Sequence, residues 1–500
     1  MRTTLAGCMA LIGPEATATD GPVDIVIEGN RIRAIRPAGT AAPEGTVIDA
    51  RRRLVTAGLI NGHLHSHEHF HKGRYDNLPL ELWMNYVRPP KPIPFTARQV
   101  YLRTMIGAIE ALRSGTTTVC DDMNVAPILH RDHVEAAFRA YEDIGVRVYV
   151  GITLFDKPFF RGMPFVDEEF PADLLRTLSG AAATPPEETL AFARELATRR
   201  HPRRNRVAYI AAPSAPQRCT EGFLRQVRAL ADELDLPVMM HVQETRLQVV
   251  TGQVLFGSTM VEYLDRLGFL KPKTTLIHAI WLNPREIEIL ARTGVTVQHN
   301  PTCNLKVGSG IAPVRALLDA GVNVSLGTDG CGSVETTDMQ KTVLTAALLQ
   351  KIRGTDHRRW VGAEEAWAAG TIGGARGLGR GDELGAVAVG RIADLAVYRL
   401  DSIPFTPLND PLRQLVYAET GANLDMVLVD GEVVLANGRL TKVDEPALLE
   451  EIGAEHRKLR PLIEEAERSV EPIRAAYQRI YDRCQAASIA DDTLPARLPW

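Results

Sequence analysis

Eight apolar, strand-like runs in the middle of the chain constrain its fold more than any other feature. Stretches of helical periodicity separate them, as in ARQVYLRTMIGAIEALRSG between the first two runs. Strands that are apolar along their whole length are buried on both faces, as in parallel sheets. Eight of them predict an α/β fold, a TIM-like (β/α)8 barrel over residues 56–390. A doubly wound sheet is disfavoured because no GxGxxG follows the first run. The runs are VTAGLINGHLH, TTTVCDDM, VRVYVGITLF, RVAYIAAPS, LPVMMHVQE, TTLIHAI, VTVQHN and VNVSLGTDG.

Strand-like segments of a different kind occur at both ends of the chain. Near the start, VDIVIEGNRIRAIR contains the hairpin signal Gly29-Asn30, and GTVIDARRRLV follows it. A matching pattern returns late, in RIADLAVYRL and MVLVDGEVVLANGRL. We therefore predict one small β-sandwich domain, assembled from residues 1–55 and 391–440.

The composition changes again near the end of the chain. Residues 441–500 are rich in Glu, Arg, Leu and Ala, and Leu448, Ile452, Leu459 and Ile463 share roughly one helical face. This pattern predicts a C-terminal helical extension that packs on the barrel or on a second subunit. A homo-oligomer is therefore expected.

Composition and charge narrow the classes of function. Hydrophobic residues make up 45% of the chain, charged residues 24%, and the net charge is −4. Such a balance is ordinary for a globular protein and offers no basic surface for nucleic acid or an anionic membrane. No apolar run has the length of a signal peptide or a membrane span. The six cysteines include no CxxC pair, which favours reduced thiols and a cytoplasmic location.

Residue types that bind metal ions stand at the ends of the predicted strands. Barrel enzymes place their catalytic groups there. Residues two apart in a strand point to the same side, so His63 and His65 can face the barrel mouth together. A single histidine at a strand end is usually structural, but a set at consecutive ends favours a metal site. Three imidazoles and one carboxylate suit zinc or ferrous iron and leave a coordination position for water. The groups at strand ends are His63, His65, His241, His278, His299 and Asp329.

Six motifs, in order along the chain, resemble those of a known superfamily. They are GLINGHLHSH, HVQET, IHAIW, VQHNPTCNLKVGSGIAPV, VSLGTDGCGS and GAVAVGRIADLAV. Together they resemble the amidohydrolase superfamily, in the branch that contains cytosine deaminase, guanine deaminase and the triazine hydrolases. The resemblance covers nearly the whole chain.

The resemblance implies a role for each group of the site. Glu244 would carry protons to the substrate ring nitrogen and the leaving group; bracing a metal ligand is its alternative role. His278 would orient the water or polarise the attacked carbon, and Asp329 would also accept a proton from the water. The cofactor would be one divalent ion, Zn²⁺ with Fe²⁺ as the alternative. The implied metal ligands are His63, His65, His241 and Asp329.

Two features bear on the number of metal ions. Two-metal relatives carry a carboxylated lysine on the fourth strand, but the corresponding run RVAYIAAPS has no lysine. One ion is therefore expected. After the first strand the chain departs from the family pattern with His67, His69 and His71. These three form either a second metal site or a structural or solvated group.

The substrate pocket is less determined than the metal site. Relatives often carry a histidine and then an aromatic residue after the fourth strand, where this chain has PSAPQ. Aromatic and polar side chains from the strand-end loops suit a flat heteroaromatic ring, with core packing under the loops as the alternative. The candidate wall residues are Trp83, Tyr86, Phe155, Gln217, Trp281 and His299.

The expected function is that of a metal-dependent aminohydrolase acting on a small molecule. It would release ammonia from an amino-substituted N-heterocycle such as a purine, pyrimidine, pterin or triazine. Release of another group, such as chloride or an alkylamine, or opening of a cyclic amide is the alternative. A non-catalytic scaffold is disfavoured because all four implied metal ligands are present.

Overall fold

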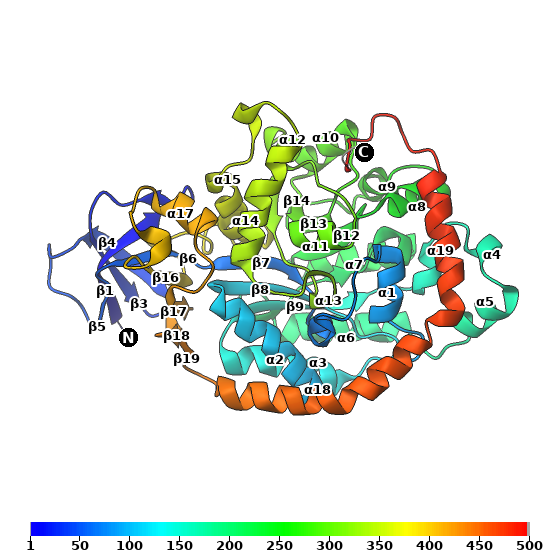
Figure 1. The fold of residues 1–500 in the computed structure, drawn as a ribbon, viewed down its shortest axis with the longest axis horizontal. Helices are drawn as coiled ribbons and strands as arrows, with labels where there is room; N and C mark the ends of the chain where they lie inside the picture. The colour runs from blue at the N-terminus through cyan, green and yellow to red at the C-terminus, as the bar shows by residue number, and fades with distance from the viewer. Residues whose placement is uncertain (1, 498–500) are drawn as a thin grey trace.

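The computed structural model describes residues 2–497 and contains the predicted barrel (Figure 1). Its eight parallel strand positions follow one another around the axis, and the fourth is divided into two short strands. The predicted (β/α)8 fold is confirmed. The barrel strands are β7 (Leu59–Leu64), β8 (Thr116–Met123), β9 (Arg147–Leu154), β10 (Val207–Tyr209) with β11 (Ala212–Pro213), β12 (Val238–Val242), β13 (Thr274–His278), β14 (Thr296–His299) and β15 (Asn323–Leu326).

Backbone hydrogen bonds close the barrel at two seams. At the first seam, the Met239 N–H donates to the Ala211 carbonyl over 2.9 Å. At the second seam, just past the ends of β15 and β7, the Asp329 N–H donates to the His63 carbonyl over 3.0 Å. A Cβ at Gly327 would lie 2.8 Å from the His63 nitrogen, so only glycine allows this approach. The second seam therefore brings two predicted ligands together.

Helices surround the barrel, and their ends follow the sequence signals. Thr96 and Gln99 form a reciprocal capping box at the start of α2, and Gly145 ends α3 in a left-handed conformation. Most of these helices bury one face on the strands. The outer helices are α2 (Ala97–Arg113), α3 (Arg131–Ile144), α6 (Pro186–Arg199), α7 (Glu221–Glu233), α8 (Arg246–Phe256), α9 (Met260–Arg266), α10 (Pro284–Thr293), α12 (Val314–Asp319), α14 (Met339–Leu349) and α15 (Ala363–Ala368).

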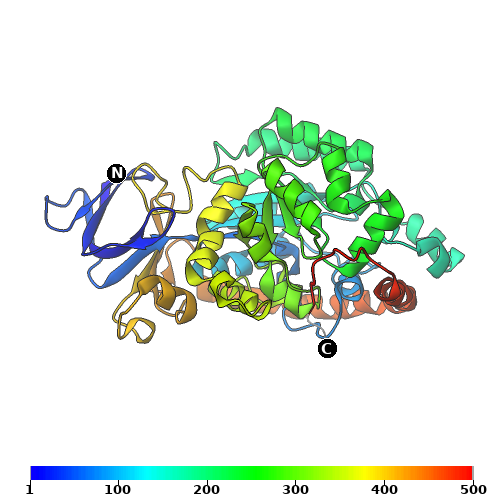
Figure 2. The same cartoon turned by 90° about the horizontal axis from the view of Figure 1, so that it is seen from above.

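Strands from both chain ends form a separate sheet beside the barrel (Figures 1 and 2). The two ends meet where β6 pairs antiparallel with β16, and the sheet encloses its own apolar core. The sheet extends to Ala57, so the expected boundary after residue 55 falls inside β6. Its strands are β1 (Arg2–Ile12), β2 (Thr17–Ala18), β3 (Val23–Glu28), β4 (Arg31–Pro37), β5 (Thr46–Asp49), β6 (Arg53–Ala57), β16 (Leu395–Arg399), β17 (Leu424–Val429), β18 (Glu432–Ala436) and β19 (Arg439–Leu440).

A buried ion pair joins the sheet to the barrel. Arg147, the first residue of β9, donates from Nε to Asp394 over 2.7 Å and from Nη2 to Asp430 over 3.0 Å. The side chains of Arg147 and Asp394 are each only 4% exposed. Burial opposes ionisation of Arg147, but the Asp394 carboxylate outweighs it and raises the pKa of the guanidinium. Arg147 therefore carries its positive charge at this buried junction.

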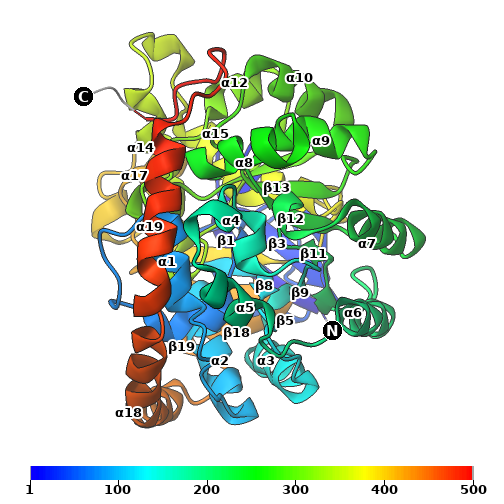
Figure 3. The same ribbon diagram turned by 90° about the vertical axis from the view of Figure 1, so that its right-hand side faces the viewer.

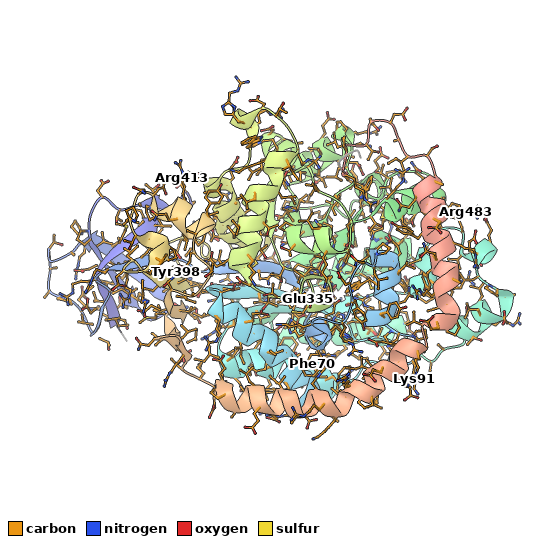
Figure 4. All side chains as sticks on the ribbon, viewed as in Figure 1. Phe70, Lys91, Glu335, Tyr398, Arg413 and Arg483 are labelled. Atoms are coloured by element: carbon orange, nitrogen blue, oxygen red, sulfur yellow. The ribbon has the colours of Figure 1, made fainter. Side chains whose placement is uncertain are left out.

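Two long helices, α18 (Glu445–Arg468) and α19 (Glu471–Ala486), form the C-terminal extension and pack along the barrel. Ion pairs tie them to it: Lys91 pairs with Glu465 of α18, and Arg483 of α19 pairs with Glu169 of α4 (Val166–Glu169) (Figure 4). Figure 3 shows α19 beside α1 (Leu80–Val87), the helix that follows the first barrel strand, along one side of the barrel. The extension therefore borders the barrel mouth.

A C-terminal tail, residues 487–497, continues across the strand-end loops. The Leu494 N–H donates to the Leu282 carbonyl over 2.9 Å, and the Ile311 N–H donates to the Ala496 carbonyl over 2.7 Å. The tail is therefore hydrogen-bonded to the loops that follow β13 and β14.

No helix among residues 2–497 is long and apolar enough to cross a membrane. All six cysteines are buried and free. Burial raises the pKa of Cys8 and of Cys219 to about 12, so these thiols are unreactive at neutral pH.

Candidate active site

The four predicted metal ligands meet at the barrel mouth. His63 lies in β7 and His65 directly follows it, His241 lies in β12, and Asp329 follows β15. Ligand atoms of the three histidines all lie within 4.8 Å of one another. The Asp329 Oδ1 atom lies 3.8 Å from His63 Nε2 and 3.5 Å from His65 Nε2. Only His241 is appreciably exposed, at 17% of its side chain.

The hydrogen bonds of these histidines suit metal ligation. His65 Nδ1 bonds the Asp122 carbonyl at 2.7 Å, and His241 Nδ1 bonds the Ser214 carbonyl at 3.0 Å. A carbonyl only accepts, so each Nδ1 carries the proton and each Nε2 offers a free lone pair. His63 is fully buried, yet neither of its ring nitrogens has a hydrogen-bond partner within residues 2–497. A buried imidazole of this kind requires a partner, and a metal ion supplies one.

The charges of the cluster also suit a divalent cation. Burial lowers the pKa of His63 and of His241 well below the usual imidazole range, so both are neutral. Burial alone would raise the pKa of Asp329, but the surrounding imidazoles, His63 first, hold it well below its usual range. The cluster thus combines neutral nitrogen ligands with one carboxylate, which zinc sites commonly use.

Glu244 and His278 lie beside the four ligands. His278 Nε2 is 3.5 Å from both Glu244 Oε2 and Asp329 Oδ2. Burial, and next the Asp329 carboxylate, raise the pKa of Glu244 well above its usual range. Burial lowers the pKa of His278, and Asp329 opposes that shift only in part. The site therefore holds a protonated carboxyl group next to a neutral imidazole and an ionised carboxylate.

The loop after β14 orients both of these groups. Asn304 Oδ1 bonds His278 Nδ1 at 2.9 Å, and the Ser309 hydroxyl donates to Glu244 Oε1 over 3.2 Å. The Ser309 carbonyl in turn accepts from the Trp281 indole N–H over 2.9 Å. Since Oε1 of Glu244 accepts from Ser309, its proton is directed to Oε2, the oxygen that faces His278.

Strained backbone marks the same strand ends. His278 and Asp329 have φ angles of 73° and 78°, and Gln243, just before Glu244, has a φ of 49°. Non-glycine residues avoid this left-handed region, and such strain is concentrated at functional sites. The surrounding hydrogen bonds hold these backbones in place.

The additional histidines after β7 are buried in a 3-10 helix, η1 (Ser66–His71). His67 and Glu68 lie near enough to His65 to form a second possible ligand group with it. However, Nδ1 of His65 is bonded to a carbonyl, so its single free nitrogen serves only one ion. Burial lowers the pKa of His69 and of His71 to about 3, so both are neutral. The Nδ1 atom of His69 bonds the Arg103 carbonyl at 2.9 Å, and this hydrogen bond suits a structural role for His69.

The predicted wall residues differ in what they offer to a substrate. The Trp83 indole N–H is bonded to the Gly332 carbonyl, and that of Trp281 is bonded to Ser309, so these two present only their ring faces. The Phe155 ring covers the Arg218 guanidinium. Gln217 Oε1 and both His299 nitrogens are buried without a partner within residues 2–497. Tyr86 packs at an angle against Tyr75. Their contact with substrate stays a prediction.

Several residues of the site lay outside the sequence prediction. The backbone carbonyls of Asp122 and Ser214 fix the tautomers of His65 and His241. The pattern of side chains in the sequence gives no sign of such backbone contacts. Glu81, buried 2.5 Å from the Thr245 hydroxyl next to Glu244, comes from helix α1, which is distant in sequence. Ser309 lies inside the motif NLKVGSGIAP, so its position could have suggested it.

Comparison with known proteins places this site in a family. The family model described as Amidohydrolase family matches residues 54–434, which include every residue of the metal cluster. The chain belongs to the amidohydrolase family. The predicted resemblance and the expectation of a hydrolase are thereby confirmed.

Relatives of this amidohydrolase include several deaminases. It is 33% identical to 5'-deoxyadenosine deaminase of Methanothermobacter thermautotrophicus over 442 residues, 88% of this chain and 96% of the relative. It is 34% identical to 5-methylthioadenosine/S-adenosylhomocysteine deaminase of Thermococcus kodakarensis over 414 residues, 82% of this chain and 89% of the relative.

Solved structures of similar fold include zinc-bound enzymes. An adenosine deaminase from Xanthomonas campestris with bound zinc superposes with a TM-score of 0.80 at 29% identity, covering 93% of this amidohydrolase and 98% of that chain. Atrazine chlorohydrolase from Arthrobacter aurescens, complexed with zinc, gives a TM-score of 0.80 at 24% identity and covers 91% and 99% of the two chains. The similarity to the atrazine chlorohydrolase shows a shared fold alone.

Proposed function

We propose that this amidohydrolase is an aminohydrolase that replaces an amino group of an N-heterocycle with oxygen and releases ammonia. The observation that carries the proposal is the position of Glu244, a buried carboxyl group 3.5 Å from His278 and next to the metal-ligating cluster. A purine is the first ring to test, because relatives carry the names of deoxyadenosine and methylthioadenosine deaminases.

The chain's own groups account for the proton transfers. His63, His65, His241 and Asp329 would hold one divalent ion, which supplies a water of lowered pKa when bound. Asp329, ionised and 3.5 Å from His278, is placed to accept a proton from an attacking water. Glu244 is placed to donate its proton to a ring nitrogen. The two protons that the water brings, the first of them held by Asp329, would then pass to the departing amine through Glu244 and restore the Glu244 carboxyl group. Ser309 and Asn304 keep Glu244 and His278 in these orientations.

Metal content tests the assignment of ligands. We expect about one zinc or iron ion per chain, and His241→Ala should remove most of it because each ligand contributes strongly to affinity. His67→Ala is the matched control, since His67 adjoins the cluster but is not assigned to it. Elemental analysis of dialysed protein measures both. Two ions per wild-type chain, one of them lost with His67→Ala, would contradict the single-ion assignment.

Ammonia release tests the reaction. Zinc- and iron-loaded enzyme, supplied with aminated purines, pyrimidines, pterins and triazines, should release ammonia in proportion to substrate loss and leave the ring intact. Asp329→Asn protein prepared in parallel is the control for contaminating deaminases. Chloride release or ring opening without ammonia from any aminated ring would instead support the alternative hydrolysis.

The cellular setting is part of the same proposal. Six free, buried thiols suit a reducing compartment such as the cytoplasm. The homo-oligomer expected from the C-terminal helices stays a prediction.

A further inference from the structure

Two arginines without acidic partners lie on loops around the barrel mouth. Arg88 directly follows α1, on the connection after β7, and Arg218 ends the 3-10 helix η3 (Pro216–Arg218) after β11. Both loops leave the strand ends at which the metal ligands also stand. Within residues 2–497, neither guanidinium has a carboxylate within 4.0 Å, although most arginines of this chain form such pairs.

Arg218 is held in place by contacts that leave one side of its guanidinium free. Its side chain is buried, with its guanidinium carbon 4.3 Å from the centre of the Phe155 ring and 5.5 Å from that of Phe159. Nε donates to the Lys157 carbonyl over 3.0 Å. The two terminal nitrogens have no hydrogen-bond partner within residues 2–497. Stacking on a ring fixes the plane of a guanidinium and presents its edge to a ligand.

Arg88 extends the positive charge toward the metal site. Its Nε atom is buried without a hydrogen-bond partner in the part of the chain that the structure describes. A Cβ at Gly332, three residues after Asp329, would lie 3.2 Å from Glu68 Oε2 and 3.4 Å from Val87 Cγ2, so the end of α1 that carries Arg88 lies near the metal-ligating cluster. The charge of Arg88 acts on Arg218, whose pKa is lowered to about 10 by burial first and by Arg88 second. Arg218 therefore remains cationic at neutral pH.

A buried guanidinium such as that of Arg218, with the charge of Arg88 acting on it, is costly unless an anion is present. Arg147 shows the usual solution in this chain, since two carboxylates surround it. A small anion that enters the mouth would give Arg88 and Arg218 the same partner. A macromolecule would not reach a guanidinium as buried as that of Arg218.

We propose that Arg88 and Arg218 form a subsite for an anionic group, a carboxylate or a phosphate, that the substrate carries beside its amino-substituted ring. This inference rests on the proposed function and specifies its substrate class. Planar guanidinium groups bind both anions through paired hydrogen bonds. The substituent would lie between the loops after β7 and β11, with the ring directed toward Glu244.

Matched substrates test the subsite. We would compare kcat/KM for 5'-deoxyadenosine, which is neutral, with S-adenosylhomocysteine, which carries a carboxylate, and adenosine 5'-phosphate. Wild-type enzyme should favour one of the two acidic substrates, and the favoured one identifies the anion. Arg218→Gln and Arg88→Gln should each lower the ratio of acidic to neutral kcat/KM about tenfold or more, as expected when a site loses its charged hydrogen bonds. Arg161→Gln is the control, because Arg161 is an exposed arginine on a nearby loop that is paired with Asp167.

The outcomes separate this inference from the proposed function. The enzyme could release ammonia from the neutral substrate while neither arginine variant changes the ratio of acidic to neutral kcat/KM. That result would overturn the subsite and would still support the proposed deaminase activity. No ammonia from any substrate would contradict the deaminase, and calorimetric binding of inosine 5'-phosphate and of S-inosylhomocysteine, each compared with inosine, then decides the subsite. Equal affinity for all three ligands would overturn it. Arg218→Lys, which keeps the charge but loses the paired geometry, replaces the glutamine variant if that one misfolds.

Discussion

Replacing Glu244 with glutamine is expected to lower kcat about a hundred- to ten-thousand-fold, the range typical of lost general acid–base catalysis. Glutamine keeps the size of the side chain and can still accept the hydrogen bond from Ser309. It cannot carry the proton that the ring nitrogen and the departing amine require. Metal content should stay near that of the wild type, because Glu244 is not among the assigned ligands. Steady-state ammonia release and elemental analysis of the same preparation measure the two effects.

Asp329→Asn provides the contrast, since this carboxylate is assigned to both metal binding and proton transfer. It should lower metal content and rate together. A substrate whose leaving group needs no proton should be less sensitive to Glu244→Gln than one that releases ammonia. Near-normal ammonia release by Glu244→Gln would instead assign the proton transfer to His278, which lies 3.5 Å from Glu244.

Removal of the Arg147 guanidinium is expected to produce a large loss of folding stability. Arg147→Met should lower the free energy of unfolding by about 3–5 kcal/mol, as is typical when one partner of a buried ion pair is removed. Asp394, 4% exposed, would keep a carboxylate without its cation at the junction of sheet and barrel. Urea denaturation followed by tryptophan fluorescence measures the change.

The control for this variant is Arg194→Met, which breaks the exposed pair of Arg194 with Glu233. Water screens such pairs, so the loss should be much smaller. If the two variants lost equal free energy of unfolding, the buried ion pair would stabilise the protein no more than the exposed pair does.

The barrel and its ligands could be predicted because their signals are local. Each barrel strand is a continuous apolar run, and burial on both faces requires that pattern. His63 and His65 occupy alternate positions of one strand, so the period of the strand alone places both at the mouth. Asp329 could be recognised because a carboxylate directly follows the last apolar run.

The residues that surround the metal ligands could not be predicted from the sequence in the same way. Arg88 and Arg218 are more than a hundred residues apart, and both lie on loops whose paths no periodicity determines. Their common place at the barrel mouth depends on the arrangement of the barrel strands. The orientation of Glu244 depends on the Ser309 hydroxyl, and nothing near Glu244 in the sequence indicates that contact. The fourth strand also broke into β10 and β11, although its run is continuous in the sequence.

The C-terminal tail has a consequence for the order in which the enzyme matures. Ile311 and Leu282, on the loops that orient Glu244 and His278, bond to Ala496 and Leu494 of the tail. During translation the barrel strands emerge long before these tail residues do. A growing chain can thus assemble its barrel strands while the loop that carries Ser309 still lacks its hydrogen bond to the tail. Catalytic competence should therefore be acquired late in synthesis, after the fold itself is in place.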